Sequence, residues 1–146
     1  MTKSVIRILL CSALMLIAPL SYSSTTVQST QELSKSLNVQ VSVSGQMSSE
    51  KFLKLMGQGF KSVIVNRPDH ETGNNVTAAE LRSIAEKLHV SLIYQPVISG
   101  QISTEDVHEF AKYYNSLPKP ILLVCKSGSR STVLFNQAKS LGLLNE

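Results

Sequence analysis

The apolar residues of this chain follow two spacings that alternate along the sequence. Apolar and polar residues alternate over 39–43, as in a half-exposed strand that ends at Gly45. Short apolar or β-branched runs predict further strands at 62–66, 91–94 and 121–124. Between these runs, apolar residues recur every three or four positions, which predicts helices over 49–56, 77–88, 103–117 and 133–141. This order predicts an α/β fold, with a central, mostly parallel sheet flanked by helices.

One of these runs stands out because it has no polar residue. Positions 121–124 read ILLV, as in a strand buried on both faces, so we expect it at the centre of the sheet. Ligands bind beyond the carboxyl ends of the strands in open α/β sheets. This strand leads directly into Cys125, which places the cysteine where a ligand would bind.

The first 23 residues have the layout of a secretory signal. Lys3 and Arg7 precede an apolar run over 8–20, and small residues at Ser21 and Ser23 suit cleavage after position 23. We therefore expect an exported protein, periplasmic or alternatively secreted, that is not held in the membrane after cleavage. An uncleaved anchor and lipoprotein processing at Cys11 are the less favoured alternatives.

The chain beyond the predicted signal divides into two parts. Residues 24–36 are rich in Ser, Thr and Gln, which predicts a flexible lead-in, and residues 37–146 form one predicted domain. Cleavage removes two basic residues and no acidic one, so 14 basic against 10 acidic residues become 12 against 10. No basic stripe remains, and we expect no nucleic-acid partner.

Cleavage would also leave Cys125 as the only cysteine. A lone thiol in an oxidising compartment cannot belong to a disulfide framework, which needs an even set of cysteines. A cysteine at a strand end is most often a small core residue. Here an arginine follows five positions later, with a glycine between them, and the two lie between a predicted strand and helix. This combination favours a functional thiol.

The segment after the strand suits anion binding. A short turn at a helix start directs successive backbone N–H groups into one concavity, and Gly128 allows the backbone to curl. Arg130 can hold an oxyanion with two parallel hydrogen bonds. We predict Cys125 and Arg130 as the catalytic pair, and the rest of the loop as the anion-binding part: Lys126, Ser127, Gly128, Ser129 and Ser131. A thiolate in such a loop is a nucleophile with an anion site attached.

At these positions the chain resembles the phosphatase-like domain of beta-lactamase hydrolase-like proteins, also called the sulfur-transferase-like or DUF442 family. The resemblance covers about residues 37 to 141. It is carried by SGQ at 44–46, GFKSVIVNRPDHE at 59–71, YQPV at 94–97, TEDV at 104–107 and CKSGSRS at 125–131. It implies a protein-tyrosine-phosphatase-like α/β fold, with Cys125 as nucleophile and Arg130 as anion holder. It also implies that Gln46 and Arg67 approach the pocket.

The loop is compatible with two chemistries. Cysteine phosphatases of the implied fold place five residues between Cys and Arg and a His before the Cys. This chain has four residues in the loop, as in rhodanese-type sulfurtransferases, and Val124 before the cysteine. A phosphatase also needs an acid to protonate the leaving oxygen. The segment 97–103, where such an acid is expected, has none, and the candidates nearby are Asp69, Glu71 and Asp106.

Sulfur transfer between thiolates needs no acid. The sequence therefore favours transfer of sulfane sulfur through a Cys125 persulfide, from a persulfide or thiosulfate to a small thiol acceptor. The alternatives are a phosphatase that forms a Cys125 phosphoenzyme, acting on a phosphoester, and a non-catalytic anion-binding module. We expect no cofactor, and the three histidines lack the spacing of metal ligands.

Overall fold

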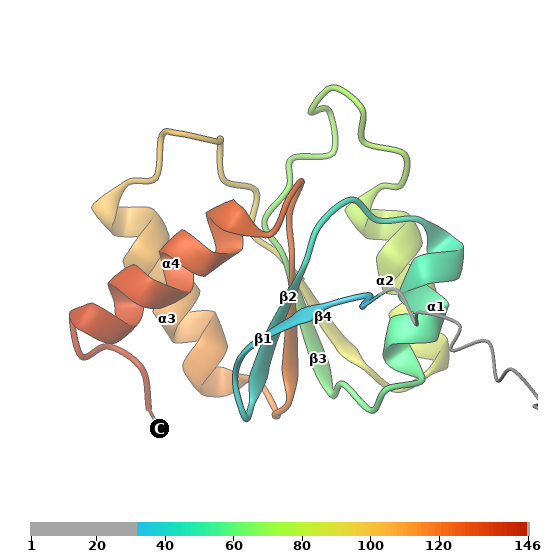
Figure 1. Cartoon of the computed structure of the whole chain (residues 1–146), viewed down its shortest axis with the longest axis horizontal. Coiled ribbons are helices and arrows are strands. Elements are labelled where there is room, and N and C mark those ends of the chain that lie inside the picture. The colour runs from blue at the N-terminus through green and yellow to red at the C-terminus, as the bar shows by residue number, and fades with distance from the viewer. Residues whose placement is uncertain (1–31, 146) are drawn as a thin grey trace, which may run out of the picture. The chain divides into compact units, whose positions relative to one another are not determined.

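Nine helices and strands follow one another in residues 32–145, the part of the chain that the computed structural model describes (Figure 1). The strands are β1 (Lys35–Asn38), β2 (Val41–Ser44), β3 (Ser62–Val65), β4 (Ser91–Tyr94) and β5 (Ile121–Val124). The helices are α1 (Ser49–Met56), α2 (Ala78–Lys87), α3 (Thr104–Ser116) and α4 (Ser129–Ser140). The signal sequence predicted over 1–23 lies outside the described residues.

The five strands form one sheet in the order β1-β2-β5-β3-β4. β2, β5, β3 and β4 run parallel, and only β1 is antiparallel to its neighbour. Val124 at the end of β5 pairs with Ser44 of β2 and with Val65 of β3, so these three strands end at one level. The predicted α/β fold and the central position of 121–124 are confirmed. The carboxyl ends of three strands therefore meet at the edge from which Cys125 follows.

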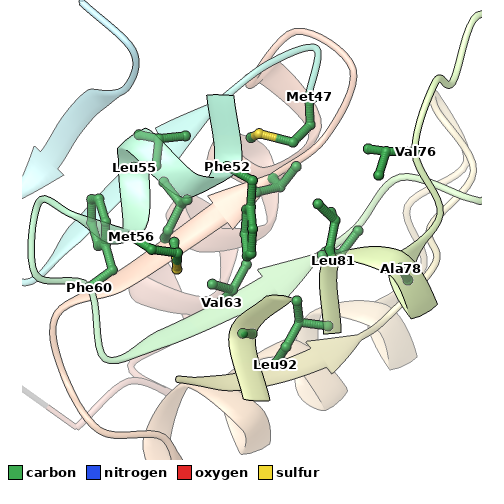
Figure 2. Packing of buried hydrophobic residues seen from close by; sticks show 14 residues of the cluster. Met47, Phe52, Leu55, Met56, Phe60, Val63, Val76, Ala78, Leu81 and Leu92 are labelled. Atoms are coloured by element: carbon green, nitrogen blue, oxygen red, sulfur yellow. The ribbon is translucent and has the colours of Figure 1, made fainter. Parts of the chain in front are cut away.

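The helices cover the sheet in pairs, α1 and α2 on one face and α3 and α4 on the other (Figure 1). Leu122 of β5 points into the first layer and Leu123 into the second, and both are fully buried. Figure 2 shows the first layer, where Phe52 of α1 and Leu81 of α2 pack over Val63 of β3. Burying each such side chain contributes roughly 1.5–3 kcal/mol. The two layers fix the central strand, and with it the position of the cysteine.

The N-terminal boundary of the domain lies earlier than predicted. Residues 24–36 were expected to be a flexible lead-in, but β1 begins at Lys35. Leu33 packs against the first hydrophobic layer, and its carbonyl accepts a hydrogen bond of 2.7 Å from the Ser44 hydroxyl. These contacts could not be predicted from the polar composition of the segment, because they involve only one leucine side chain and one backbone oxygen.

The strand predicted over 39–43 is the second half of a hairpin. Val39, which shares the apolar alternation, is 97% exposed in the turn between β1 and β2. Asn38 makes this turn, because its side-chain oxygen accepts the N–H of Gln40 at 2.8 Å. Alternation alone did not reveal that the first valine lies outside the sheet.

Three helices, α1, α2 and α3, begin where their capping residues predict. The last helix, predicted over 133–141, begins earlier, at Ser129, because its first turn is polar and leaves no hydrophobic pattern. Thr77 and Ser103 each form a capping box at the start of α2 and α3. The buried faces of the helices are narrower than the apolar pattern suggests. Leu53 in α1 and Leu88 and Leu141 at the ends of α2 and α4 are about half exposed. No helix within residues 32–145 is long and apolar enough to cross a membrane.

Candidate active site

Cys125 follows the last residue of β5, and only 1% of its surface is exposed. Its N–H donates to the carbonyl of Ser44 at 3.2 Å, which extends the pairing of β2 and β5 by one step. The Gly128 N–H points at the Cys125 Sγ from 3.1 Å. The sulfur is thus held inside the loop by a backbone hydrogen bond.

The loop from Cys125 to Arg130 turns back on itself at Gly128. This residue has φ 91° and ψ −22°, in the left-handed region that glycine tolerates best. It is also the N-cap of α4, and no side chain caps the helix there. Lys126, Ser127 and Ser129 are exposed, and the Ser129 N–H and the Ser129 hydroxyl both contact the Ser127 hydroxyl. The anion-binding role of these residues stays a prediction.

Arg130 is buried, with 4% of its side chain exposed, and three of its N–H donors have partners. Nη1 donates to the carbonyls of Asn66 (3.1 Å) and Val97 (2.8 Å), and Nη2 donates to Glu71 Oε2 (2.6 Å). Nε is buried and has no hydrogen-bond partner in residues 32–145. A guanidinium has five N–H donors, so one on Nε and one on Nη2 remain. These two can hold an oxyanion.

Glu71 lies between two arginines. Its Oε1 is 3.0 Å from Nε of Arg67, whose side chain is 3% exposed, and its Oε2 contacts Arg130. Arg67 also donates to Gln46 Oε1 at 2.5 Å and to the carbonyl of Thr72 at 3.0 Å. The resemblance implied that Gln46 and Arg67 approach the pocket; in the structure Gln46 contacts Arg67, and Arg67 contacts Glu71, which in turn contacts Arg130. Two buried guanidiniums share one carboxylate here, so the cluster has one positive charge in excess.

A second polar network lies beneath the loop. The Ser131 hydroxyl donates to Asn66 Oδ1 at 2.8 Å, and the Asn66 amide donates to Gln95 Oε1 at 3.2 Å. All three residues are at least 97% buried. The Ser131 hydroxyl thus anchors α4 to β3, although the sequence suggested an anion-binding role for it. Neither Asn66 nor Gln95 was predicted from the sequence, and the signal that could have found them was a polar residue directly after a strand.

The three candidate acids occupy different places. Glu71 touches Arg130, as described above. Asp69 lies in the same loop, but its Oδ1 accepts the Ala78 N–H at 2.7 Å at the start of α2. Asp106 is part of the capping box of α3, where its Oδ2 accepts the N–H and the hydroxyl of Ser103. Of these three carboxylates, the structure brings only Glu71 to the anion holder.

A groove of about 500 Å³ runs along the outside of the cysteine loop. The residues that line it include Gly45, Ser127, Gly128, Lys35 and Lys51. Partial burial lowers the pKa of Lys51. Neither Cys125 nor Arg130 lines this groove. Within residues 32–145, no group of three or more His, Cys, Asp or Glu could hold a metal ion.

The sequence model of the family described as "Beta-lactamase hydrolase-like protein, phosphatase-like domain" matches residues 34–142. The chain belongs to this family. The beta-lactamase hydrolase-like protein of Xylella fastidiosa (strain Temecula1) is 27% identical over 99 residues, which are 68% of this chain and 23% of the relative. That of Agrobacterium fabrum (strain C58) is 28% identical over 105 residues, 72% and 24% of the two chains. The chain therefore spans about a quarter of the length of these relatives.

Solved structures agree with the family. A protein from Neisseria meningitidis, provisionally named a phosphatase, matches with a TM-score of 0.67 and 25% identity, over 73% of this chain and 75% of its own. The catalytic core of a PP-IP phosphatase from S. cerevisiae matches with a TM-score of 0.54 and 19% identity, over 69% and 61%. The second likeness bears on the fold alone. The predicted protein-tyrosine-phosphatase-like fold is confirmed.

The family and the Neisseria meningitidis structure support a cysteine-based, phosphatase-like domain. They give no such support to sulfur transfer, to a thiol acceptor or to export, all of which stay predictions.

Proposed function

We propose that this protein is a phosphatase that transfers a phosphoryl group from a small phosphate-containing anion to Cys125 and then to water. The observation that carries the proposal is that one short loop begins with a buried thiol and ends with a buried arginine whose Nε has no partner within residues 32–145. The Gly128 N–H points at the sulfur from 3.1 Å, and the buried Nε of Arg130 has no partner within residues 32–145. Phosphoryl oxygens would satisfy these donors and balance the excess positive charge of the arginine pair.

Each part of the site has one role in this reaction. The Cys125 thiolate attacks phosphorus, while the loop N–H groups and Arg130 hold the oxygens on which charge develops. Glu71 and Arg67 touch no reacting atom in this scheme. Glu71 positions Arg130 through their ion pair, and Arg67 holds Glu71 in place. Water then hydrolyses the phosphocysteine and restores the thiolate.

The test is the hydrolysis of an aryl phosphate by the purified protein. We expect a rate that vanadate inhibits, that Cys125→Ser abolishes and that Arg130→Ala reduces by about 10²–10³-fold. Thermal unfolding and circular dichroism of each variant check that the fold is kept. A folded wild-type protein that leaves aryl phosphates intact contradicts the proposal.

Transfer of sulfane sulfur is the second candidate function. It is favoured by the loop, which has four residues between Cys125 and Arg130, and by the segment 97–103, which has no acid. Cys125 would take sulfur from a persulfide or thiosulfate and pass it to a small thiol. Mass spectrometry after donor treatment should then show a sulfur adduct on Cys125, absent from Cys125→Ser. Assaying both substrates on one preparation separates the two candidates.

We also propose that the protein acts in the periplasm after removal of residues 1–23. The support is the basic, apolar and small-residue pattern of that segment. N-terminal sequencing of the protein from a periplasmic fraction should begin at Ser24. Recovery of the uncut chain from the cytoplasmic fraction contradicts this proposal.

A further inference from the structure

Two loops form a wall on the Arg130 side of the site, residues 66–77 after β3 and residues 95–103 after β4. Both leave the sheet at the same edge as the cysteine loop (Figure 1). Arg130 binds both of them, through the carbonyl of Asn66 and the carbonyl of Val97. An acid that protonates a leaving oxygen must lie within hydrogen-bond reach of that oxygen, and this wall is where it would be placed.

The carboxyl groups of the first loop are held by other partners. Glu71 contacts Arg67 at 3.0 Å and Arg130 at 2.6 Å, so each of its two oxygens is already paired with a guanidinium. An ionised carboxylate accepts hydrogen bonds and has no proton to give. Asp69 is turned toward α2, where it accepts the N–H of Ala78 at 2.7 Å.

The second loop has no carboxyl group between positions 97 and 103. The next two carboxyl groups in the sequence, Glu105 and Asp106, lie in the first turn of α3. Glu105 is exposed, and Asp106 accepts the N–H of Ser103 at 2.8 Å and its hydroxyl at 3.0 Å, as part of the capping box of this helix. Its backbone is fixed as well, since the Gln95 amide donates to the Asp106 carbonyl at 2.9 Å.

We infer that the enzyme acts on phosphate compounds whose leaving group departs as an anion without being protonated. Aryl phosphates and phosphoanhydrides belong to this class, and alkyl phosphomonoesters do not. The inference rests on the proposed phosphatase function. In the first step the S–P bond forms and the P–O bond breaks, and its electron pair stays on the leaving oxygen, a phenolate or a phosphate. In the second step water attacks phosphorus, the Cys125 thiolate leaves, and the proton of water passes to solvent.

Four other titratable groups lie in or next to these loops. The Tyr94 hydroxyl accepts the N–H of Asp69 at 2.9 Å, and His70, Glu105 and Lys126 are exposed. Within residues 32–145, none of the four forms a hydrogen bond or an ion pair with Cys125 or Arg130. His70→Ala, Glu105→Gln and Lys126→Ala therefore belong in the test beside the other carboxyl variants.

The experiment is a leaving-group series on the full chain with 4-nitrophenyl, phenyl and ethyl phosphate, and with pyrophosphate as the phosphoanhydride. We expect kcat/KM to fall by about 10²–10⁴-fold from 4-nitrophenyl to ethyl phosphate, the range that a general acid would otherwise supply. Pyrophosphate should be turned over faster than ethyl phosphate. Asp69→Asn, Asp106→Asn and His70→Ala should leave the slope of the series unchanged.

Two results overturn the inference while the phosphatase function stands. One is a kcat/KM that hardly changes from 4-nitrophenyl to ethyl phosphate. The other is a variant among Asp69→Asn, Glu71→Gln, Glu105→Gln, Asp106→Asn, His70→Ala and Lys126→Ala that slows phenyl phosphate strongly and spares 4-nitrophenyl phosphate, since this identifies a working acid. If the folded protein turns over none of the four compounds, the proposed function itself is wrong, and the inference falls with it.

Discussion

The two sides of the cysteine loop are held by different kinds of contact. On the β3 side, Arg130 is fixed by two carbonyls and by Glu71. On the β2 side, backbone approaches backbone: a Cβ added to Gly45 would lie 3.1 Å from the Lys126 carbonyl oxygen and 3.2 Å from the Ser127 Cα. The first side depends on charge and the second on the absence of a side chain. Substitutions on the two sides should therefore impair the protein through different physical effects.

The largest effect should come from the guanidinium itself. Arg130→Lys keeps the charge but loses the planar set of donors, so we expect kcat/KM for an aryl phosphate to fall about 10²–10³-fold. Steady-state kinetics measures this loss. Arg82→Lys, exposed on α2, is the matched control and should behave as wild type. An active Arg130→Lys would mean that charge alone suffices on this side.

Removing the carboxylate between the arginines should rank second. Glu71→Gln leaves two buried guanidiniums without their counter-charge, and we expect a loss of about 1–3 kcal/mol in the free energy of unfolding. Misalignment of Arg130 should also lower kcat about tenfold. Urea unfolding and kinetics measure the two effects. Glu50→Gln removes the exposed ion pair with Lys54 and should change neither; a stable and fully active Glu71→Gln would show that the carbonyls alone position Arg130.

On the β2 side, Gly45→Ala tests close packing. The new methyl group meets the loop backbone at 3.1–3.3 Å, and the loop must shift to admit it. We expect about 1–2 kcal/mol of destabilisation and a lower rate with an unchanged response to salt, because no charge is involved. Gly57→Ala at the end of α1, with φ −61° and its added Cβ 3.3 Å from the Lys54 carbonyl oxygen, shows what a similar close approach costs away from the cysteine loop. A wild-type rate in Gly45→Ala would refute the steric account of this side.

The smallest effect should come from Lys51, which lies in the groove outside the loop. Its Nζ donates to the Gln46 carbonyl at 3.0 Å, and the contact is exposed. We expect Lys51→Ala to stay within about 0.5 kcal/mol of wild type in stability and to keep its activity. Thermal unfolding and kinetics check this. A marked rise in KM would mean that the β2 side also uses charge.

Hydrophobic pattern predicted the fold well. The run 121–124 is the buried central strand, and the apolar positions 107, 110, 111 and 114 of α3 are all buried. The pattern failed where side-chain hydrogen bonds or a few isolated contacts decide the structure. The Asn38 turn and the docking of Leu33 are examples. Neither feature produces a hydrophobic periodicity in the sequence.

The loop chemistry could be predicted because its parts are adjacent in sequence. Cys125, Gly128 and Arg130 lie within six positions, and their roles follow from a strand, a turn and a helix start. The surrounding network could not be derived in this way. Glu71 and Arg130 are 59 positions apart, and Asn66 and Ser131 are 65 apart. Such pairs become visible only when the strand order is known.

The antiparallel strand β1 bears on how the protein behaves in concentrated solution. A flat, regular outer strand can recruit a second chain and start aggregation. β1 has only four residues, its register shifts between Ser36 and Asn38, and it begins with Lys35. These features interrupt the row of unpaired N–H and C=O groups along the outer edge of β1. β1 thus disfavours intermolecular strand pairing at its edge of the sheet.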